Sequence, residues 1–153
     1  MTPFTRGLLV LLHLLGAIAW VGGMWFAYFC LRPAAAETLD PTKRLPLWVA
    51  TFERFLRYIA TAVVVIVISG FTMLIQAGLR AAPVGWLVMA GLGLVMTIIF
   101  SYVYLILFPR LRVHCLALAW PNAAIAMNDI RRLVAINLAL ALFTVIVAVF
   151  ARY

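Results

Sequence analysis

The hydrophobic pattern of this chain is dominated by four long stretches that contain no Lys, Arg, Asp or Glu. They are residues 7–31, 58–79, 81–109 and 133–151. Each is long enough to cross a bilayer as an α-helix, which takes about 20 residues. In lipid a helix satisfies its own backbone hydrogen bonds. The pattern therefore predicts one integral membrane domain, residues 1–153, with transmembrane helices at about 7–31, 56–79, 84–109 and 130–151.

Each predicted helix has one face on which small, polar, aromatic or sulfur-containing residues recur at helical spacing. In chain order the members of these faces are His13, Gly16, Ala17, Trp20, Met24 and Ala27; Thr61, Ser69, Thr72 and Gln76; Met89, Gly93, Met96, Phe100 and Tyr104; and Asn137, Ala141, Thr144 and Ala148. Small and polar residues belong at helix contacts in membranes. We therefore expect an all-α, four-helix transmembrane bundle with these faces inside, in which Ser69, Thr72 and Asn137 form interhelical hydrogen bonds.

Prolines mark the connections between the predicted helices. Residues 32–48 contain Pro33, Pro41 and Pro46, which predict a surface connection with room for a short interfacial helix. The short segment LRAAPVG, residues 79–85, predicts an antiparallel hairpin of the second and third helices. The longer joint before the last helix is predicted to extend both of its neighbours, with a break at Pro121 and Asn122.

Composition and charge agree with a membrane protein. Hydrophobic residues make up 68% of the chain and charged residues 10%, whereas soluble domains are only about half apolar. The lipid bilayer is therefore the expected partner. The net charge is +8, but the basic residues lie at the ends of apolar stretches and form no stripe with interleaved aromatic residues, so we expect no nucleic-acid partner.

The basic residues are distributed unevenly between the two sides of the predicted bundle. Nine flank the two longer connections: Arg32, Lys43, Arg44, Arg54, Arg57, Arg110, Arg112, Arg131 and Arg132. Three lie on the opposite side, namely Arg6, Arg80 and Arg152. Because cytoplasmic loops carry the excess of Lys and Arg, the sequence predicts both longer connections in the cytoplasm and both termini outside.

The segment LLHLLGAIAWVGGMWF, residues 11–26, contains a single titratable residue, His13. An ionisable group in the hydrocarbon region is costly unless it is paired, and such residues usually face the bundle interior and mark function. Two readings stay open. His13 is either a neutral imidazole bonded to a hydroxyl or carbonyl group of a neighbouring helix, or a ligand in a functional site.

Depth along the helices selects partners for His13. It lies six residues into the first helix, roughly 9 Å from the outer end, while Met73 and Met89 lie roughly 6 Å deep on the second and third helices. Imidazole and thioether groups suit Cu(I), which predicts a metal site of His13, Met73 and Met89. A His/Met pair is also an axial set for haem iron, so haem b with His13 and one of these methionines is the alternative.

Two further residues near the inner face bear on the haem alternative. Arg57 is predicted to snorkel to the interface or to meet an anionic group such as a haem propionate or a lipid phosphate. The other histidine, His114, lies past the inner end of the third helix, a membrane thickness away from His13. The predicted topology therefore excludes a haem held by both histidines of one chain.

Three segments resemble the CopD-like (copper resistance protein D) family of membrane proteins. They are LHLLGAIAWVGGMWFAYFCLRP, with His13 and Trp20; FERFLRYIATAVVVIVISGF, with Arg57; and IRRLVAINLALALFTVIVAVFARY. The resemblance implies a multi-pass protein of the bacterial inner membrane linked to copper resistance or uptake, with a copper donor protein or an electron-transfer partner. It also adds Trp20 to the expected cofactor-binding residues.

The chain is more distantly similar to the HemJ-type protoporphyrinogen oxidases, small four-helix membrane proteins whose first helix also bears a histidine. That resemblance implies haem b. The third predicted helix, GWLVMAGLGLVMTIIFSYVYLILF, has no basic residue, whereas the oxidase-like proteins carry a lysine there. The difference argues against protoporphyrinogen oxidation by this chain.

The sequence shows no arrangement typical of hydrolysis or phosphoryl transfer. It has no Ser/His/Asp arrangement, paired carboxylates, phosphate loop or HExxH segment, and its four acidic residues all lie in segments predicted on the cytoplasmic side. We therefore expect no catalytic residues. A third reading, besides copper and haem, is a structural or assembly subunit in which His13 only packs.

Overall fold

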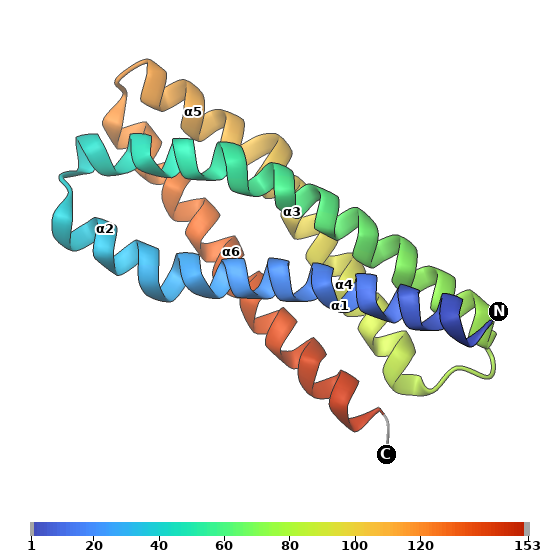
Figure 1. Cartoon of the computed structure of the whole chain (residues 1–153). Coiled ribbons are helices and arrows are strands. Elements are labelled where there is room, and N and C mark those ends of the chain that lie inside the picture. Colours follow the sequence, from blue (N-terminus) through green and yellow to red (C-terminus); the bar gives the residue numbers. More distant parts are fainter. Residues whose placement is uncertain (1, 152–153) are drawn as a thin grey trace.

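The computed structural model describes residues 2–151, and this range is almost entirely helical (Figure 1). The elements are α1 (Pro3–Phe26), η1 (Ala27–Leu31), α2 (Arg32–Thr38), α3 (Pro41–Ala77), α4 (Val84–Tyr102), η2 (Val103–Leu107), α5 (Phe108–Leu116) and α6 (Trp120–Phe150), where η marks π-helical turns. They form four continuous rods, Pro3–Thr38, Pro41–Ala77, Val84–Leu116 and Trp120–Phe150, each long and apolar enough to cross a membrane. The predicted all-α class and the four membrane-spanning helices are confirmed.

Every rod extends beyond the range that the apolar stretches predict. The prolines explain why, because proline is well tolerated at the first helical position, where its missing N–H would have no partner. Pro3, Pro33, Pro41 and Pro121 all lie within the first two positions of a helix. Pro3, Pro41 and Pro121 therefore mark the starts of rods, whereas Pro33 and Pro46 lie within continuous rods.

The structure corrects two sequence expectations about the connections, although the short helix expected within residues 32–48 is present as α2. The predicted surface connection 32–48 is the helix α2 followed by the start of α3, with only residues 39–40 between them. The second break lies at residues 117–119 instead of Pro121–Asn122, and Leu118 adopts a positive φ of 55° there. The hairpin between α3 and α4 is present, with its turn at residues 78–83.

Both π-helical segments end two residues before a proline. Segment η1 ends at Leu31, before Pro33, and η2 ends at Leu107, before Pro109. A proline inside a helix removes one backbone hydrogen bond and its ring meets the carbonyl four residues earlier. The wider π turn accommodates this ring, which is why the first and third rods continue through their prolines.

The four rods pack as two pairs. Helix α1 packs along α3, and α4 packs along α6, whereas α1 meets α4 at few residues, among them Trp20 and Phe100. Figure 1 shows the N-terminus, the α3–α4 turn and the last turns of α6 at one end of the bundle, which we call the terminal end. The opposite end carries α2, the start of α3, α5 and the α5–α6 turn, and we call it the basic end.

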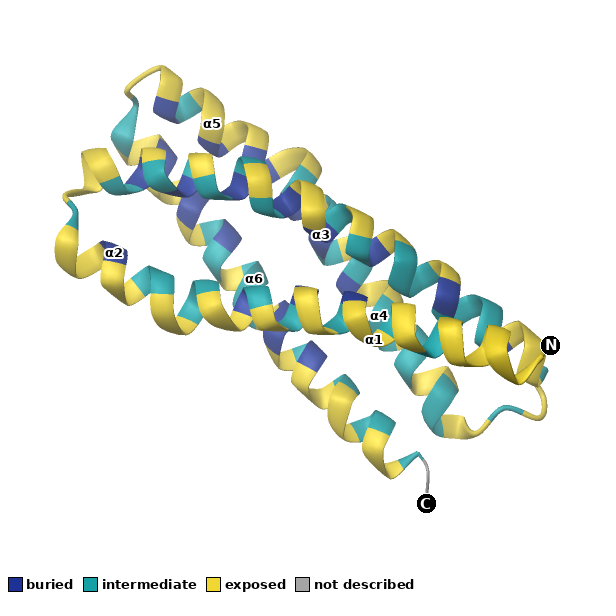
Figure 2. Cartoon of the chain, viewed as in Figure 1, coloured by how far each residue is buried: buried dark blue, intermediate teal, exposed yellow. Residues whose placement is uncertain are grey.

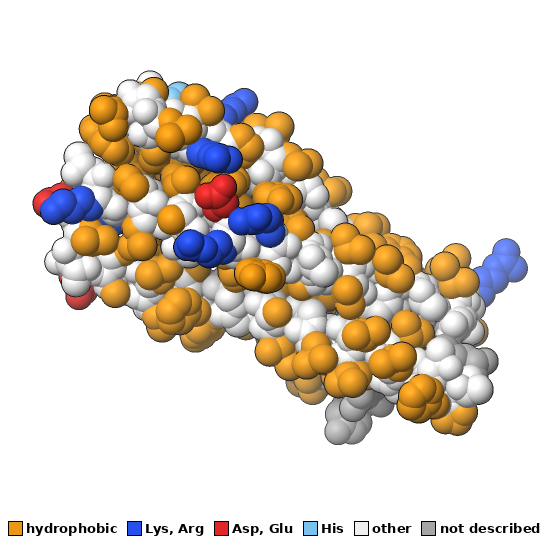
Figure 3. Space-filling model, turned by 45° about the horizontal axis from the view of Figure 1, so that its top comes forward, with side chains coloured by type: hydrophobic (Ala, Val, Ile, Leu, Met, Phe, Trp, Pro, Cys, Tyr) orange, Lys and Arg blue, Asp and Glu red, His pale blue; other side chains and the backbone are white. Residues whose placement is uncertain are grey.

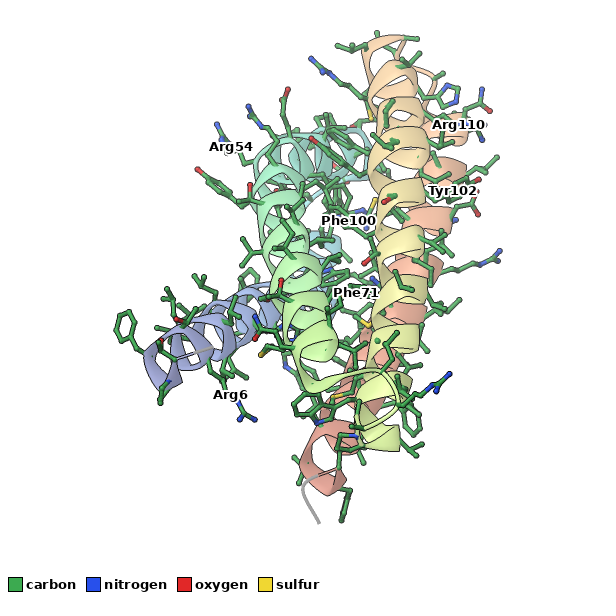
Figure 4. All side chains as sticks on the ribbon, turned by 90° about the vertical axis from the view of Figure 1, so that its right-hand side faces the viewer. Arg6, Arg54, Phe71, Phe100, Tyr102 and Arg110 are labelled. Carbon is green, nitrogen blue, oxygen red and sulfur yellow. The ribbon has the colours of Figure 1, made fainter. Side chains whose placement is uncertain are left out.

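Charge separates the two ends. Figure 3 shows basic side chains gathered over the basic end, with hydrophobic side chains over much of the remaining visible surface. In Figure 4, Arg54 and Arg110 lie toward one end of the bundle and Arg6 lies toward the other. Within residues 2–151 the one ion pair joins Arg112 to Glu53 at 3.7 Å, and both side chains are exposed, so this pair adds little stability.

The buried core lies in the middle of the bundle and toward the basic end (Figure 2). Its larger members include Trp20, Trp48, Phe52, Phe100 and Leu111. Few residues near the terminal end are buried; Ser69 and Leu74 of α3 are two of them. The terminal half of the bundle is therefore the more loosely packed half.

The predicted inner faces of the first, third and fourth helices are confirmed by burial, since Gly16, Met24, Met96 and Ala141 are all buried. The face predicted for the second helix is confirmed only in part, because Ser69 is buried and Thr72 is half-buried but the other two members are not. Its members Thr61 and Gln76 are exposed, and the face that packs inward carries these apolar residues: Trp48, Phe52, Leu56, Ile59 and Val63. The hydroxyl of Thr61 is satisfied within its own helix by the carbonyl of Arg57, 3.3 Å away, and needs no neighbouring helix.

Candidate functional site

His13 lies half-buried where α1 packs against α3. Its Nδ1 atom is 3.1 Å from the backbone carbonyl oxygen of Ile66 and 3.1 Å from the hydroxyl oxygen of Ser69. Gly70 makes room for the ring, because a Cβ atom at this position would lie 3.0 Å from Cε1 of His13. His13, the one titratable residue of residues 11–26, thus contacts two polar groups on α3, the carbonyl of Ile66 and the hydroxyl of Ser69. We call these two groups the polar step.

These contacts determine which ring nitrogen carries the proton. The hydroxyl of Ser69 lies 2.6 Å from the carbonyl oxygen of Val65 and 3.2 Å from that of Ile66, so it donates to the backbone. Its oxygen is then left as an acceptor for His13, and the carbonyl of Ile66 can only accept. Nδ1 of His13 is therefore the donor, and Nε2 carries the free lone pair.

Nε2 of His13 has no hydrogen-bond partner among the residues that the structure describes. A histidine that binds a metal through one ring nitrogen typically donates its other N–H to a carbonyl or carboxylate group, which fixes the ring and the tautomer. The contacts of His13 fulfil the first of its two readings, a neutral imidazole bonded to a neighbouring helix. They also leave Nε2 unprotonated, as the second reading, a metal ligand, requires.

The two methionines predicted to accompany His13 lie on different helices. Met73 is half-buried on α3, about one helical turn after Ser69 and Gly70. Those two residues lie beside the imidazole of His13. Met89 is half-buried on α4, which packs mainly along α6. Joint ligation of one copper ion by the three residues stays a prediction.

The remaining predicted site residues lie nearer the basic end. Trp20 is 4% exposed and packs edge to face on Phe100, with ring centroids 5.9 Å apart. Figure 4 shows Phe100 between α3 and α4. Arg57 is exposed, and its Nε donates to the backbone carbonyl of Glu53 at 2.7 Å. His114 lies on α5, separate from His13 on α1.

A second feature, which the sequence did not predict, is a partly enclosed hollow at the centre of the bundle. Residues of all four rods line it, and its volume is about 50 Å³. Its walls are almost wholly apolar and carry the rings of Trp20, Tyr28, Trp48, Phe52, Phe55 and Phe100. We call it the central hollow.

Three strongly polar side chains line the central hollow: Arg32, Arg131 and Asn137. Asn137 was expected to bond to a neighbouring helix, but Oδ1 of this buried residue has no hydrogen-bond partner among residues 2–151. A buried polar atom without a protein partner commonly bonds to water or to a bound molecule. Sequence periodicity found Asn137 as a polar residue on an inner face, but it could not show that the space opposite is empty of protein.

The comparison with known families gives one match. The family model described as CopD, copper resistance protein D, matches residues 49–151, which run from within α3 to the end of α6. The match does not include α1 and His13. Searches of the curated proteins and of the solved structures returned no match. Because the family model covers more than half of the chain, the protein belongs to the CopD family of membrane proteins.

Proposed function

We propose that this multi-pass membrane protein handles copper and binds Cu(I) through His13, Met73 and Met89. The observation that carries the proposal is the orientation of the His13 ring. Nδ1 faces the carbonyl of Ile66 and the hydroxyl of Ser69, so Nε2 is the nitrogen with a free lone pair. We choose copper as the metal because the chain belongs to a family described by copper resistance. The soft thioether groups of the two methionines suit the reduced ion, Cu(I).

The charge distribution supports an orientation for this site. Nine of the twelve basic residues flank the connections at the basic end, and such an excess marks the cytoplasmic side of a bacterial inner-membrane protein. Both termini and the His13 end of α1 would then face the outside. Copper from a donor protein outside the cytoplasm would reach the site without crossing the bilayer.

A metal-binding measurement on the full chain tests the proposal. Purified protein is loaded with Cu(I) under reducing conditions, and bound copper is measured for the parent, His13→Ala and His114→Ala. We expect His13→Ala to lose the copper and His114→Ala to keep it, because only His13 faces the polar step on α3. Circular dichroism and gel filtration check that both variants fold. Equal copper in His13→Ala and the parent would contradict the proposal.

Haem b is the second candidate for the same nitrogen, since Nε2 of His13 is also the atom that an axial histidine uses. Met73 or Met89 would then be the opposite ligand. An absorption spectrum of protein from haem-sufficient cells distinguishes the two functions. We expect no Soret band that depends on His13, and such a band in the parent that is lost in His13→Ala would favour haem.

A further inference from the structure

Two arginines from different rods line the central hollow. Arg32 begins α2 and Arg131 lies in α6, and both side chains are half-buried. The positive charge of Arg44 reaches Arg131 as well, and no carboxylate of the described residues is among the charges that act on Arg131. In the same part of the chain the one ion pair is Arg112–Glu53. Partly buried guanidinium groups without a counter-charge are costly, so the hollow favours an occupant with negative charge.

Asn137 adds an acceptor to the same hollow. Its side chain is buried, and Oδ1 has no hydrogen-bond partner among residues 2–151. The volume of about 50 Å³ leaves room for a few water molecules, and the walls are almost wholly apolar. A buried water needs several polar partners, and Asn137 alone does not supply them. The occupant must therefore be small, negatively charged toward the arginines and able to donate a hydrogen bond toward Asn137.

A small inorganic anion with one water molecule meets these three requirements. Guanidinium N–H groups are strong donors to anions, and chloride is little larger than a water molecule. Arg131 and Asn137 are six residues apart on α6, roughly 9 Å along the helix, so more than one small molecule is needed to connect their side chains. A water between the anion and Asn137 donates one O–H to each of them, because the anion and Oδ1 both accept.

We propose that the central hollow binds one monovalent inorganic anion of about chloride size at Arg32 and Arg131, with a water molecule that links the anion to Oδ1 of Asn137. The anion offsets the repulsion between the two arginines and so holds the first and last rods together at the basic end. The proposal is independent of copper binding, because His13, Met73 and Met89 do not line the hollow.

Iodide, a heavy halide that quenches tryptophan on contact, is the probe for this site. Trp20 and Trp48 line the hollow and are 4% and 5% exposed, so iodide in bulk solution reaches them poorly. A reporter protein keeps these two tryptophans and carries Trp25→Phe, Trp86→Phe and Trp120→Phe. The full chain is purified in an uncharged detergent. Iodide then replaces gluconate at constant ionic strength, since gluconate is too large for the hollow.

We expect quenching that saturates with iodide concentration and is reversed by chloride, which does not quench tryptophan. Arg32→Gln and Arg131→Gln should each raise the iodide concentration at half-maximal quenching about tenfold, the effect of losing one charge-assisted hydrogen bond. Asn137→Leu should raise it about threefold, because it removes a neutral hydrogen bond. Arg132→Gln is the matched control, since Arg132 is the adjacent, exposed arginine of the same helix and does not line the hollow. Circular dichroism and gel filtration check that the variants fold.

Three outcomes would overturn the proposal. The first is quenching that rises linearly with iodide and never saturates, which is the behaviour of random collisions. The second is a half-maximal concentration that is unchanged in Arg131→Gln, or that shifts as much in Arg132→Gln, which would assign the effect to general surface charge. The third is displacement of iodide by phosphatidylglycerol added to the micelles but not by chloride, which would assign the two arginines to a lipid head group.

Discussion

At the scale of single residues, the environment of His13 depends on a glycine. The ring occupies space above Gly70 that a side chain would enter, with a Cβ atom 3.0 Å from Cε1. We predict that Gly70→Ala displaces the imidazole from Ser69 and weakens Cu(I) binding by about tenfold, equivalent to the loss of roughly one good hydrogen bond. A Cu(I) competition titration measures the effect. Gly91→Ala is the control, because a Cβ atom there meets nothing within 4 Å, and an equal effect of the two changes would contradict the prediction.

Asn137 gives a second prediction at this scale. Its Oδ1 is buried without a protein partner, and an unsatisfied buried polar group costs about 1–3 kcal/mol. Leucine has the same branched shape and the same number of side-chain heavy atoms but is apolar and larger, and Asn137 borders the central hollow. Asn137→Leu should therefore raise the unfolding temperature of the protein in detergent. Asn122→Leu at an exposed position should leave it nearly unchanged. A lower unfolding temperature for Asn137→Leu would show that its amide is satisfied in the folded protein.

At the scale of the elements, glycines determine how closely α1 approaches α3. A Cβ atom at Gly16 would lie 2.7 Å from a side-chain atom of Ile66 and 3.2 Å from the backbone oxygen of Ala62. We predict that Gly16→Val separates the two helices and lowers the free energy of unfolding by about 1–3 kcal/mol, the usual cost of overpacking. Gly22→Val on the same helix has open space around it and should have little effect. Denaturant titration in mixed micelles compares the two, and equal destabilisation would argue against close α1–α3 packing.

The helices themselves could be predicted from the sequence because long apolar stretches and helical spacing are local signals. The stretches gave the number of spans, and the small-residue face of α1 is the face that is buried. The helix boundaries could not be predicted, because Pro33 and Pro109 look like helix breaks while the preceding π turns accommodate them. Most of the inner face of α3 was also missed, since Thr61 satisfies its own hydroxyl and large apolar residues form much of the contact.

The candidate site could be predicted only in part. His13 was identified by its chemistry, as an ionisable group in an apolar segment, and one of its partners, Ser69, was on a predicted inner face. The acceptor from Ile66 and the space above Gly70 are properties of the α1–α3 contact, which is not encoded at any single position. The central hollow was missed for the same reason, since Trp20, Arg32, Arg131 and Asn137 are brought together from distant parts of the chain.

At the scale of the whole molecule, the separation of charge between the two ends predicts the orientation in the membrane. Nine basic residues at the basic end should hold both connections there in the cytoplasm, and both termini should lie outside. A C-terminal fusion to a reporter that is active only outside the cytoplasm should therefore be active. Activity of a reporter that works only in the cytoplasm, fused at the same place, would invert the orientation and move His13 to the inner leaflet.

The central claim is that copper binds to Nε2 of His13 together with thioether sulfur. X-ray absorption spectroscopy of the Cu(I)-loaded protein tests it most directly, because the first coordination shell separates nitrogen from sulfur ligands. We predict a mixed shell of one nitrogen and two sulfur atoms in the parent, and loss of one sulfur in each of Met73→Leu and Met89→Leu. The His13→Ala variant should give no such shell, because it no longer holds the copper. A shell that contains no sulfur, or one that is unchanged in His13→Ala, would contradict the account.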